Sequence, residues 1–176
     1  MIGGTLDWMA QAQASVETAV ERRPYGVLLA RLGQEAIARF RRSLRPLQLS
    51  AQEFIVLRQL SAMGPTSQTA LAEALAVDNS NLGSVTAQLL SRGAIERPRD
   101  RSDRRRYLVD LTPSGRHLLS DADAAIRADE DDMLSALDET ELAQLWDLLR
   151  RVADSIALCP DGDAQSCAQA DAAEGC

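Results

Sequence analysis

Residues 69–93 read TALAEALAVDNSNLGSVTAQLLSRG, and this stretch decides the fold. Residues 67–75 have the apolar spacing of a short helix, for which Thr66 is the predicted cap. Asp78 is a favoured N-cap for a second helix, which should end at Gly93 because glycine readily adopts the left-handed conformation found after helices. Only two residues separate the helices, so they must cross steeply. This arrangement is typical of a helix-turn-helix.

The residue pattern changes to period two after Gly93. Residues 94–99 and 105–111 alternate apolar and polar side chains, as half-buried strands do, and the polar stretch 100–104 lies between them. A β-hairpin, here called the wing, is therefore predicted directly after the helix-turn-helix. Its apolar positions are Ile95, Tyr107, Val109 and Leu111.

Longer helical patterns flank this region on both sides. Helices are predicted over residues 25–44, 51–63 and 113–136, and from residue 139 onward. Ser50 with Glu53 and Asp138 with Glu141 have the spacing of capping boxes, and Thr112 precedes Pro113 as a further cap. The side chains of residues 51–63 expected to face inward are Phe54, Ile55, Leu57 and Leu60. The chain should be mainly α with a small β-hairpin wing.

The last helix carries a regular apolar seam. Its apolar residues recur at intervals of three and four, which is the spacing of a coiled-coil contact and indicates a partner helix. They are Leu142, Leu145, Leu149, Val152 and Ile156. Residues 1–23 have the spacing of a short amphipathic helix, whereas residues 158–176 lack periodicity and are expected to form a flexible tail.

Composition excludes several classes of protein. The chain has 176 residues, 45% of them hydrophobic and 26% charged, which is typical of a globular domain. No apolar run approaches the roughly 18 residues of a membrane span, and the first residues lack the pattern of a secretory signal. A cytoplasmic protein without a membrane partner is expected. Catalytic signatures such as a P-loop or H-E-x-x-H are absent from the sequence, so we expect no enzyme.

The charge is segregated along the chain. The formal net charge is -7, which alone would argue against a polyanionic partner. Residues 92–106, however, hold seven arginines and three acidic residues, a net +4, whereas residues 117–176 hold fifteen acidic residues and three arginines, a net -12. A compact basic segment in an acidic body indicates a localised anionic partner.

The outward face of the second short helix suits DNA. This face presents serine, amide and small side chains without a single charge, and such groups can approach base edges closely in the major groove. An ordinary solvated helix would explain the face equally well if it stood alone. The arginine-rich wing that follows favours DNA binding, because arginine is attracted to a narrow minor groove and its phosphates. A helical module that binds a protein partner is the alternative outside DNA binding.

Residues 50–115 resemble the winged helix-turn-helix of the MarR family of bacterial transcription regulators. The resemblance rests on LSAQEFIVLRQL at residues 49–60, on the helix-turn-helix and wing, and on two motifs. The first motif is D-x-x-D-R-R from Asp100 to Arg105, and the second is L-T-x-x-G from Leu111 to Gly115. The similarity extends over about residues 24–157. It implies a sequence-specific transcription regulator, with repression the expected mode.

The resemblance also implies an organisation of the chain. Residues 24–49 and 113–157 would be dimerisation helices, residues 50–112 the DNA-binding lobe, residues 1–23 a helical extension and residues 158–176 a cysteine-containing tail. The homodimer would bind double-stranded DNA with an inverted repeat whose half-sites lie about 10 base pairs apart. A small aromatic or anionic effector would release the DNA, and the sequence leaves the effector site unassigned.

The residues that the resemblance implicates fall into two groups. The predicted DNA-binding residues are Asn79, Ser80, Asn81, Ser84, Gln88, Arg97, Arg101, Arg104 and Arg105. The predicted dimer interface contains Leu28, Leu142, Leu145, Leu149, Val152 and Ile156. Ser84 and Gln88 occupy positions that are often basic in the family, so this helix should contact fewer phosphates. Asp103 is expected to hold a neighbouring arginine.

The cysteines offer an alternative switch. Cys159, Cys167 and Cys176 lie eight and nine residues apart in the acidic tail, where a pair could form a disulfide or respond to a metal. The Cys and His spacings of strong metal sites are absent from the sequence. We therefore expect no metal and no cofactor, and the thiol switch remains the alternative to an effector.

Overall fold

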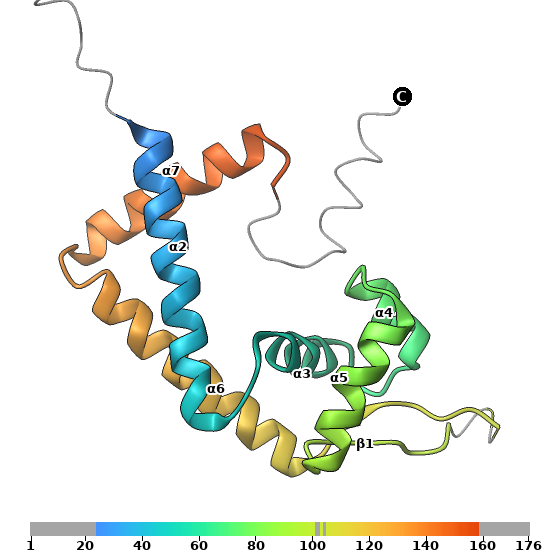
Figure 1. Ribbon diagram of the computed structural model, residues 1–176. Coiled ribbons are helices and arrows are strands. Elements are labelled where there is room, and N and C mark those ends of the chain that lie inside the picture. Colours follow the sequence, from blue (N-terminus) through green and yellow to red (C-terminus); the bar gives the residue numbers. More distant parts are fainter. Residues whose placement is uncertain (1–23, 101–102, 104, 159–176) are drawn as a thin grey trace, which may run out of the picture. The chain divides into compact units, whose positions relative to one another are not determined.

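The computed structural model describes residues 24–100, 103 and 105–158, of which most are helical (Figure 1). The helices are α2 (Tyr25–Leu44), the 3-10 helix η1 (Arg45–Leu47), α3 (Ala51–Met63), α4 (Gln68–Ala74), α5 (Asn79–Ser91), α6 (Pro113–Met133) and α7 (Glu139–Ser155). The strands are β1 (Ile95–Glu96) and β2 (Asp110–Leu111). The predicted fold class, mainly α with a hairpin wing, is confirmed. The extension predicted for residues 1–23 lies outside the described residues, as does the tail predicted for residues 158–176 except for residue 158.

Side-chain caps fix where the helices begin. The N-caps of α3 to α7 are Ser50, Ser67, Asp78, Thr112 and Asp138. Ser50 and Asp138 form full capping boxes with the third residue of their helices, as predicted. Each cap satisfies a backbone N–H that the first helical turn leaves without a partner.

Thr66 is not the cap of α4, so that prediction is wrong. Its N–H donates to the carbonyl oxygen of Val109 at 3.1 Å, and its own carbonyl accepts from the Val109 N–H at 2.7 Å. Ser67 takes the capping position instead and accepts from the Ala70 N–H. A contact with a residue more than forty positions away decides the start of this helix.

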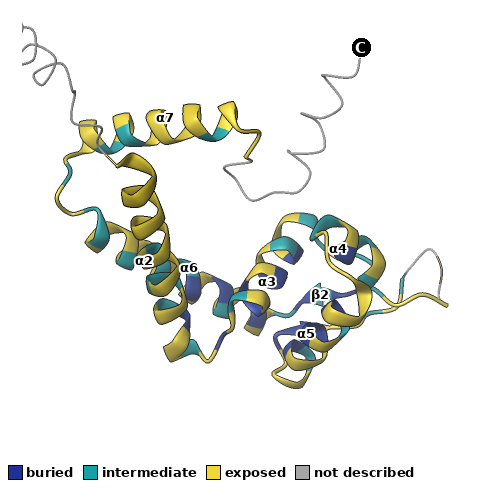
Figure 2. Ribbon diagram, turned by 45° about the horizontal axis from the view of Figure 1, so that its top comes forward, coloured by how far each residue is buried: buried dark blue, intermediate teal, exposed yellow. Residues whose placement is uncertain are grey.

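The hydrophobic core lies among α3, α4, α5, the wing and the first turns of α6, a region here called the lobe, and it includes Leu44 and Leu49 before α3 (Figure 2). Its fully buried side chains include Leu57, Leu60, Leu71 and Leu89. The prediction that Ile55 faces inward is wrong: its side chain is 47% exposed, and the neighbouring Val56 is buried instead. Both residues are apolar, so the sequence does not distinguish the buried face of α3 at this point.

The strands of the wing are shorter than the residue pattern predicts, because β1 and β2 contain only two residues each. β1 and β2 pair antiparallel with Ile95 opposite Leu111, and isolated bridges join Arg99 to Tyr107 and Thr66 to Val109. Ile95, Val109 and Leu111 are buried, whereas Tyr107 is 54% exposed. The Arg99 guanidinium lies 5.5 Å from the centre of the Tyr107 ring, and such a cation–π contact stabilises an aromatic ring at the surface.

The helices predicted to form the dimer interface expose apolar side chains. The chain divides into two units at Ile37 and Ala38, within α2. In the first unit, Leu28 and Leu32 on α2 are exposed, and within Glu139–Ser155 of the second no residue is buried (Figure 2). Helix α6 ends at Met133, earlier than predicted, and the following N–H groups of Ser135 and Leu137 bond to carbonyls three residues back, those of Asp132 and Leu134, in place of the α-helical pattern. Over the described residues, no helix is both long and apolar enough to cross a membrane.

Candidate nucleic-acid interface

Helix α5 separates a buried face from a polar one. Leu82, Val85, Thr86 and Leu89 are buried against the lobe. Thr86 is a buried polar residue that sequence reasoning missed, and its hydroxyl donates within the helix to the carbonyls of Leu82 and Gly83. The predicted DNA-binding residues of this helix are all exposed: Asn79, Ser80, Asn81, Ser84 and Gln88. The structure therefore places the five on the solvent side of one helix.

The N-terminus of α5 is organised around Asp78. Its carboxylate accepts from the Asn81 N–H at 2.9 Å and from the Ser80 hydroxyl at 2.7 Å. These bonds favour the charged form, so the pKa of Asp78 lies below its ordinary value, first because of the Asn81 N–H and then because of the Ser80 hydroxyl. The Ser80 proton is thus engaged, which leaves the oxygen of this hydroxyl to act as an acceptor.

The arginines of the wing have different surroundings. Arg97 Nη2 donates to Gln68 Oε1 at 2.9 Å, so a residue of α4 holds the base of the wing. Arg105 is exposed, and its backbone N–H donates to Asp103 Oδ1 at 3.0 Å. In this contact Asp103 holds the backbone of the wing tip and does not bind a guanidinium. Arg101 and Arg104 lie outside the described residues.

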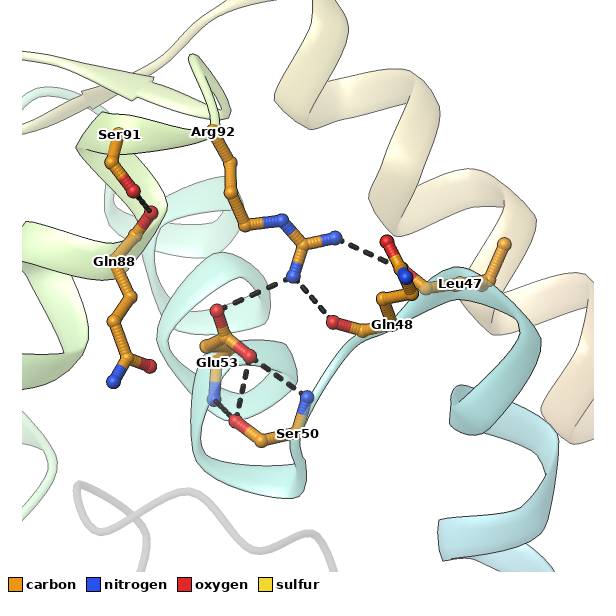
Figure 3. Close-up of polar contacts among 7 residues, drawn as sticks. All are labelled: Leu47, Gln48, Ser50, Glu53, Gln88, Ser91 and Arg92. Atoms are coloured by element: carbon orange, nitrogen blue, oxygen red, sulfur yellow. Dashed lines mark hydrogen bonds and ion pairs between the residues drawn. The ribbon is translucent and has the colours of Figure 1, made fainter.

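Arg92 belongs to the basic segment by sequence, yet its guanidinium contacts the turn between η1 and α3. Its Nη1 donates to the Gln48 carbonyl at 2.6 Å and lies 3.4 Å from Glu53 Oε1, while its Nη2 donates to the Leu47 carbonyl at 2.9 Å. Figure 3 shows the side chain pointing from the end of α5 toward the turn between η1 and α3. Sequence reasoning counted this residue only as a charge.

Glu53 is the centre of this cluster. It is buried, and its second carboxylate oxygen accepts from the N–H and the hydroxyl of Ser50, both at 2.8 Å (Figure 3). A buried carboxylate is costly unless it is paired and hydrogen-bonded, and Arg92 together with Ser50 meets both needs. The capping-box spacing signalled Glu53 in the sequence, but nothing in the sequence pointed to its arginine partner.

The remaining predicted site residues are those of the dimer seam and the three cysteines of the thiol switch. Leu142 and Leu145 are half-buried, whereas Leu28, Leu149, Val152 and Ile156 are exposed. Cys159, Cys167 and Cys176 lie outside the described residues. Over the residues that are described, no group of three or more histidine, cysteine, aspartate or glutamate side chains is placed to hold a metal ion.

Comparisons with known proteins agree with this geometry. The model of the MarR family matches residues 49–107, which run from the turn before α3 into the wing. The transcriptional repressor NicR of Pseudomonas putida is 29% identical over 153 residues, covering 84% of this chain and 97% of that protein. The structure of Bordetella bronchiseptica BpsR, whose DNA binding is regulated by 6-hydroxynicotinic acid, is 30% identical, with a TM-score of 0.58 over 75% of this chain and 94% of that one. A Mycobacterium tuberculosis protein in complex with DNA is 29% identical, with a TM-score of 0.62 over 73% and 97%.

Proposed function

Because this chain belongs to the MarR family, we propose that it regulates transcription as a homodimer that binds an inverted-repeat operator and leaves it when a small effector binds. The observation that carries the proposal is the position of an uncharged polar helix face directly before a basic wing. As a regulator that acts on DNA, the protein would work in the cytoplasm and would have no catalytic role.

Helix α5 would read base edges in the major groove. Asn81 and Gln88 carry amides that can pair bidentately with adenine, and Ser84 can donate to or accept from any base. Ser80 would act only as an acceptor, because its proton is held by Asp78. With no cation on its exposed face, α5 would contribute specificity and little phosphate affinity.

The wing would supply the electrostatic part of the affinity. Arg105, with Arg101 and Arg104, would lie at the minor groove or its phosphates, where each neutralised phosphate steepens the salt dependence of binding. Arg97 would stand at the base of the wing, where Gln68 sets the direction of its guanidinium.

The effector would be a small aromatic or anionic compound. BpsR supports this class, because 6-hydroxynicotinic acid is an aromatic carboxylate. A ligand that binds better to the DNA-free dimer must lower the affinity of the dimer for its operator. By linkage, operator DNA lowers the affinity of the dimer for the ligand by the same factor. We would test 6-hydroxynicotinic acid first, by adding it to the operator complex. An unchanged operator affinity would exclude this compound as the effector.

The experiment that tests DNA binding is a footprint and a titration. The full-length protein is expected to protect an inverted repeat in the DNA flanking its own gene, with half-sites about 10 base pairs apart. Arg105→Ala should reduce the slope of log affinity against log salt by roughly one or two units, since a homodimer would lose one contact in each half-site. The matched control is Arg127→Ala on α6, which removes an exposed arginine outside the wing and should leave the slope unchanged.

Two results would contradict the proposal. One is the absence of any protected duplex at low salt. The other is an equal effect of the two arginine substitutions, since this would mean that net charge and not the wing determines affinity.

A further inference from the structure

The guanidinium of Arg92 connects two segments that are far apart in the chain. Arg92 is the C-cap of α5, and its carbonyl partners, Leu47 and Gln48, precede it by 45 and 44 residues. The same nitrogen that donates to Gln48 also pairs with the carboxylate of Glu53 at the start of α3 (Figure 3). The end of the helix that would read DNA is thus bonded to the turn that follows α2.

The carbonyl oxygens that Arg92 contacts belong to a turn with a left-handed residue. Gln48 has a φ of 51°, a left-handed conformation that is uncommon for residues other than glycine. Its N–H bonds to Arg45, and the next N–H, that of Leu49, bonds back to Leu44, so the turn is closed on its α2 side. The outward carbonyls of Leu47 and Gln48 accept the planar fork of Arg92, which can reach two acceptors at once.

The end of α2 is also bonded to α6. Arg39 Nη1 lies 2.8 Å from Asp132 Oδ2 and 3.8 Å from Asp129 Oδ1. Phe40, one residue further, meets the ring of Phe54 in α3 edge to face, with centroids 5.5 Å apart. The last turns of α2 are therefore held by α3 and α6, and Arg92 contacts the turn itself from the end of α5.

We propose that Arg92 is a positioning residue for operator recognition. It fixes the angle between α5 and the end of α2, and it thereby sets the separation of the two α5 helices in the homodimer. This inference rests on the proposed function, because the separation has meaning only if α2 leads to a dimer interface and α5 enters DNA. The guanidinium of Arg92 contacts Leu47, Gln48 and Glu53, so its role in this inference is to hold the turn and not to neutralise a phosphate.

The test measures discrimination between half-site spacings. The probe is an inverted-repeat duplex enriched from random-sequence DNA by the full-length wild-type protein, together with the same duplex lengthened or shortened by one central base pair. One base pair moves the half-sites by about 3.4 Å and rotates them by about 35°. The wild type should prefer the original spacing by about tenfold or more, and Arg92→Gln should reduce this preference to about threefold or less. The salt slope should stay at the wild-type value.

Two further variants separate positioning from stability. Arg92→Lys keeps the charge but not the planar fork, so its preference should fall between those of Arg92→Gln and the wild type. Leu60→Val lowers stability from the other end of α3 without touching the turn, and it should keep the wild-type preference. If Arg92→Gln fails to fold by circular dichroism, Arg92→Lys decides the question.

The inference is overturned if Arg92→Gln, or Arg92→Lys in its place, keeps the wild-type spacing preference. It is also overturned if Leu60→Val loses the same preference, or if the salt slope of Arg92→Gln falls by about one or two units, which would make Arg92 a phosphate contact. A wild-type protein that enriches no duplex would instead overturn the proposed function, and with it this inference.

Discussion

At the scale of single residues, Gly115 is a position where the packing leaves no room for a side chain. Gly115 lies in the first turn of α6, and a Cβ at this position would overlap the carbonyl oxygen of Ala94. That same oxygen accepts from the N–H and the hydroxyl of Thr112, which caps α6. Gly115 therefore lets the wing and α6 meet, and the L-T-x-x-G motif of the sequence has a steric cause.

Gly115→Ala is expected to lower the free energy of unfolding by about 1–3 kcal/mol, because the backbone of Ala94 must move and its bonds with Thr112 must lengthen. Urea denaturation followed by circular dichroism measures the change. Gly33→Ala in α2 is the matched control, since nothing lies within 4 Å of its notional Cβ and alanine is the better helix former. Equal destabilisation by the two substitutions would show that the contact at Ala94 has no special role.

At the scale of secondary structure elements, local rules were sufficient where the partners are close in sequence. Asp78, Thr112 and Asp138 cap α5, α6 and α7 as predicted, because a cap and its partner are only three residues apart. The period of 3.6 likewise predicted which side of α5 is exposed. Most of the fold and the exposed face of the candidate site could be predicted in this way.

The sequence predictions fail where contacts between residues far apart in the chain determine the structure. Thr66 pairs with Val109, so the cap of α4 moves by one residue. Tyr107 follows the alternation of a strand but is exposed beside Arg99. The role of Arg92 depends on carbonyls of a turn 44 and 45 residues earlier, and no sequence pattern records a side chain that bonds to backbone oxygen atoms.

The cap of α5 makes the stability of this helix sensitive to pH. Because the pKa of Asp78 is lower in the folded chain than in the unfolded one, its charged form contributes stability that is present above the unfolded pKa of about 3.9 and is lost as the pH falls through the folded pKa. The wild-type melting temperature should therefore fall more than that of Asp78→Asn between pH 5 and about pH 3. Thermal melts by circular dichroism measure both.

Asp121→Asn on α6 is the control for Asp78→Asn. It changes the net charge equally but away from the first turn of a helix, so its melting temperature should follow the wild-type profile. Parallel profiles for Asp78→Asn and the wild type would contradict the stabilising role of the anionic cap.

At the scale of the whole molecule, the described residues combine a well-packed lobe with a long helix, α7, that has no buried residue. The core lies among α3 to α6 and the wing, whereas within Glu139–Ser155 no side chain is buried (Figure 2). Trp146, Leu149 and Val152 are among the exposed apolar side chains of α7. Exposed apolar surface on this scale marks an association site, which supports the proposed homodimer.

Leu149→Asp should convert the dimer to a monomer, because a carboxylate would be buried in an apolar contact without a partner. Sedimentation equilibrium measures the mass, and operator affinity should fall at least tenfold in parallel. Gln144→Asp introduces the same charge at a polar, exposed position of α7 and should leave both quantities unchanged. A Leu149→Asp protein that stays dimeric would place the interface elsewhere.

The exposed apolar side of α7 has a consequence for gene control. In the proposed homodimer, α7 would gain stability from the second copy, so subunit folding and pairing would be linked equilibria. When copies are few, promoter occupancy then rises with the square of their number instead of linearly. Gene expression would therefore respond more steeply to the protein concentration than it would to a regulator that is dimeric at every concentration.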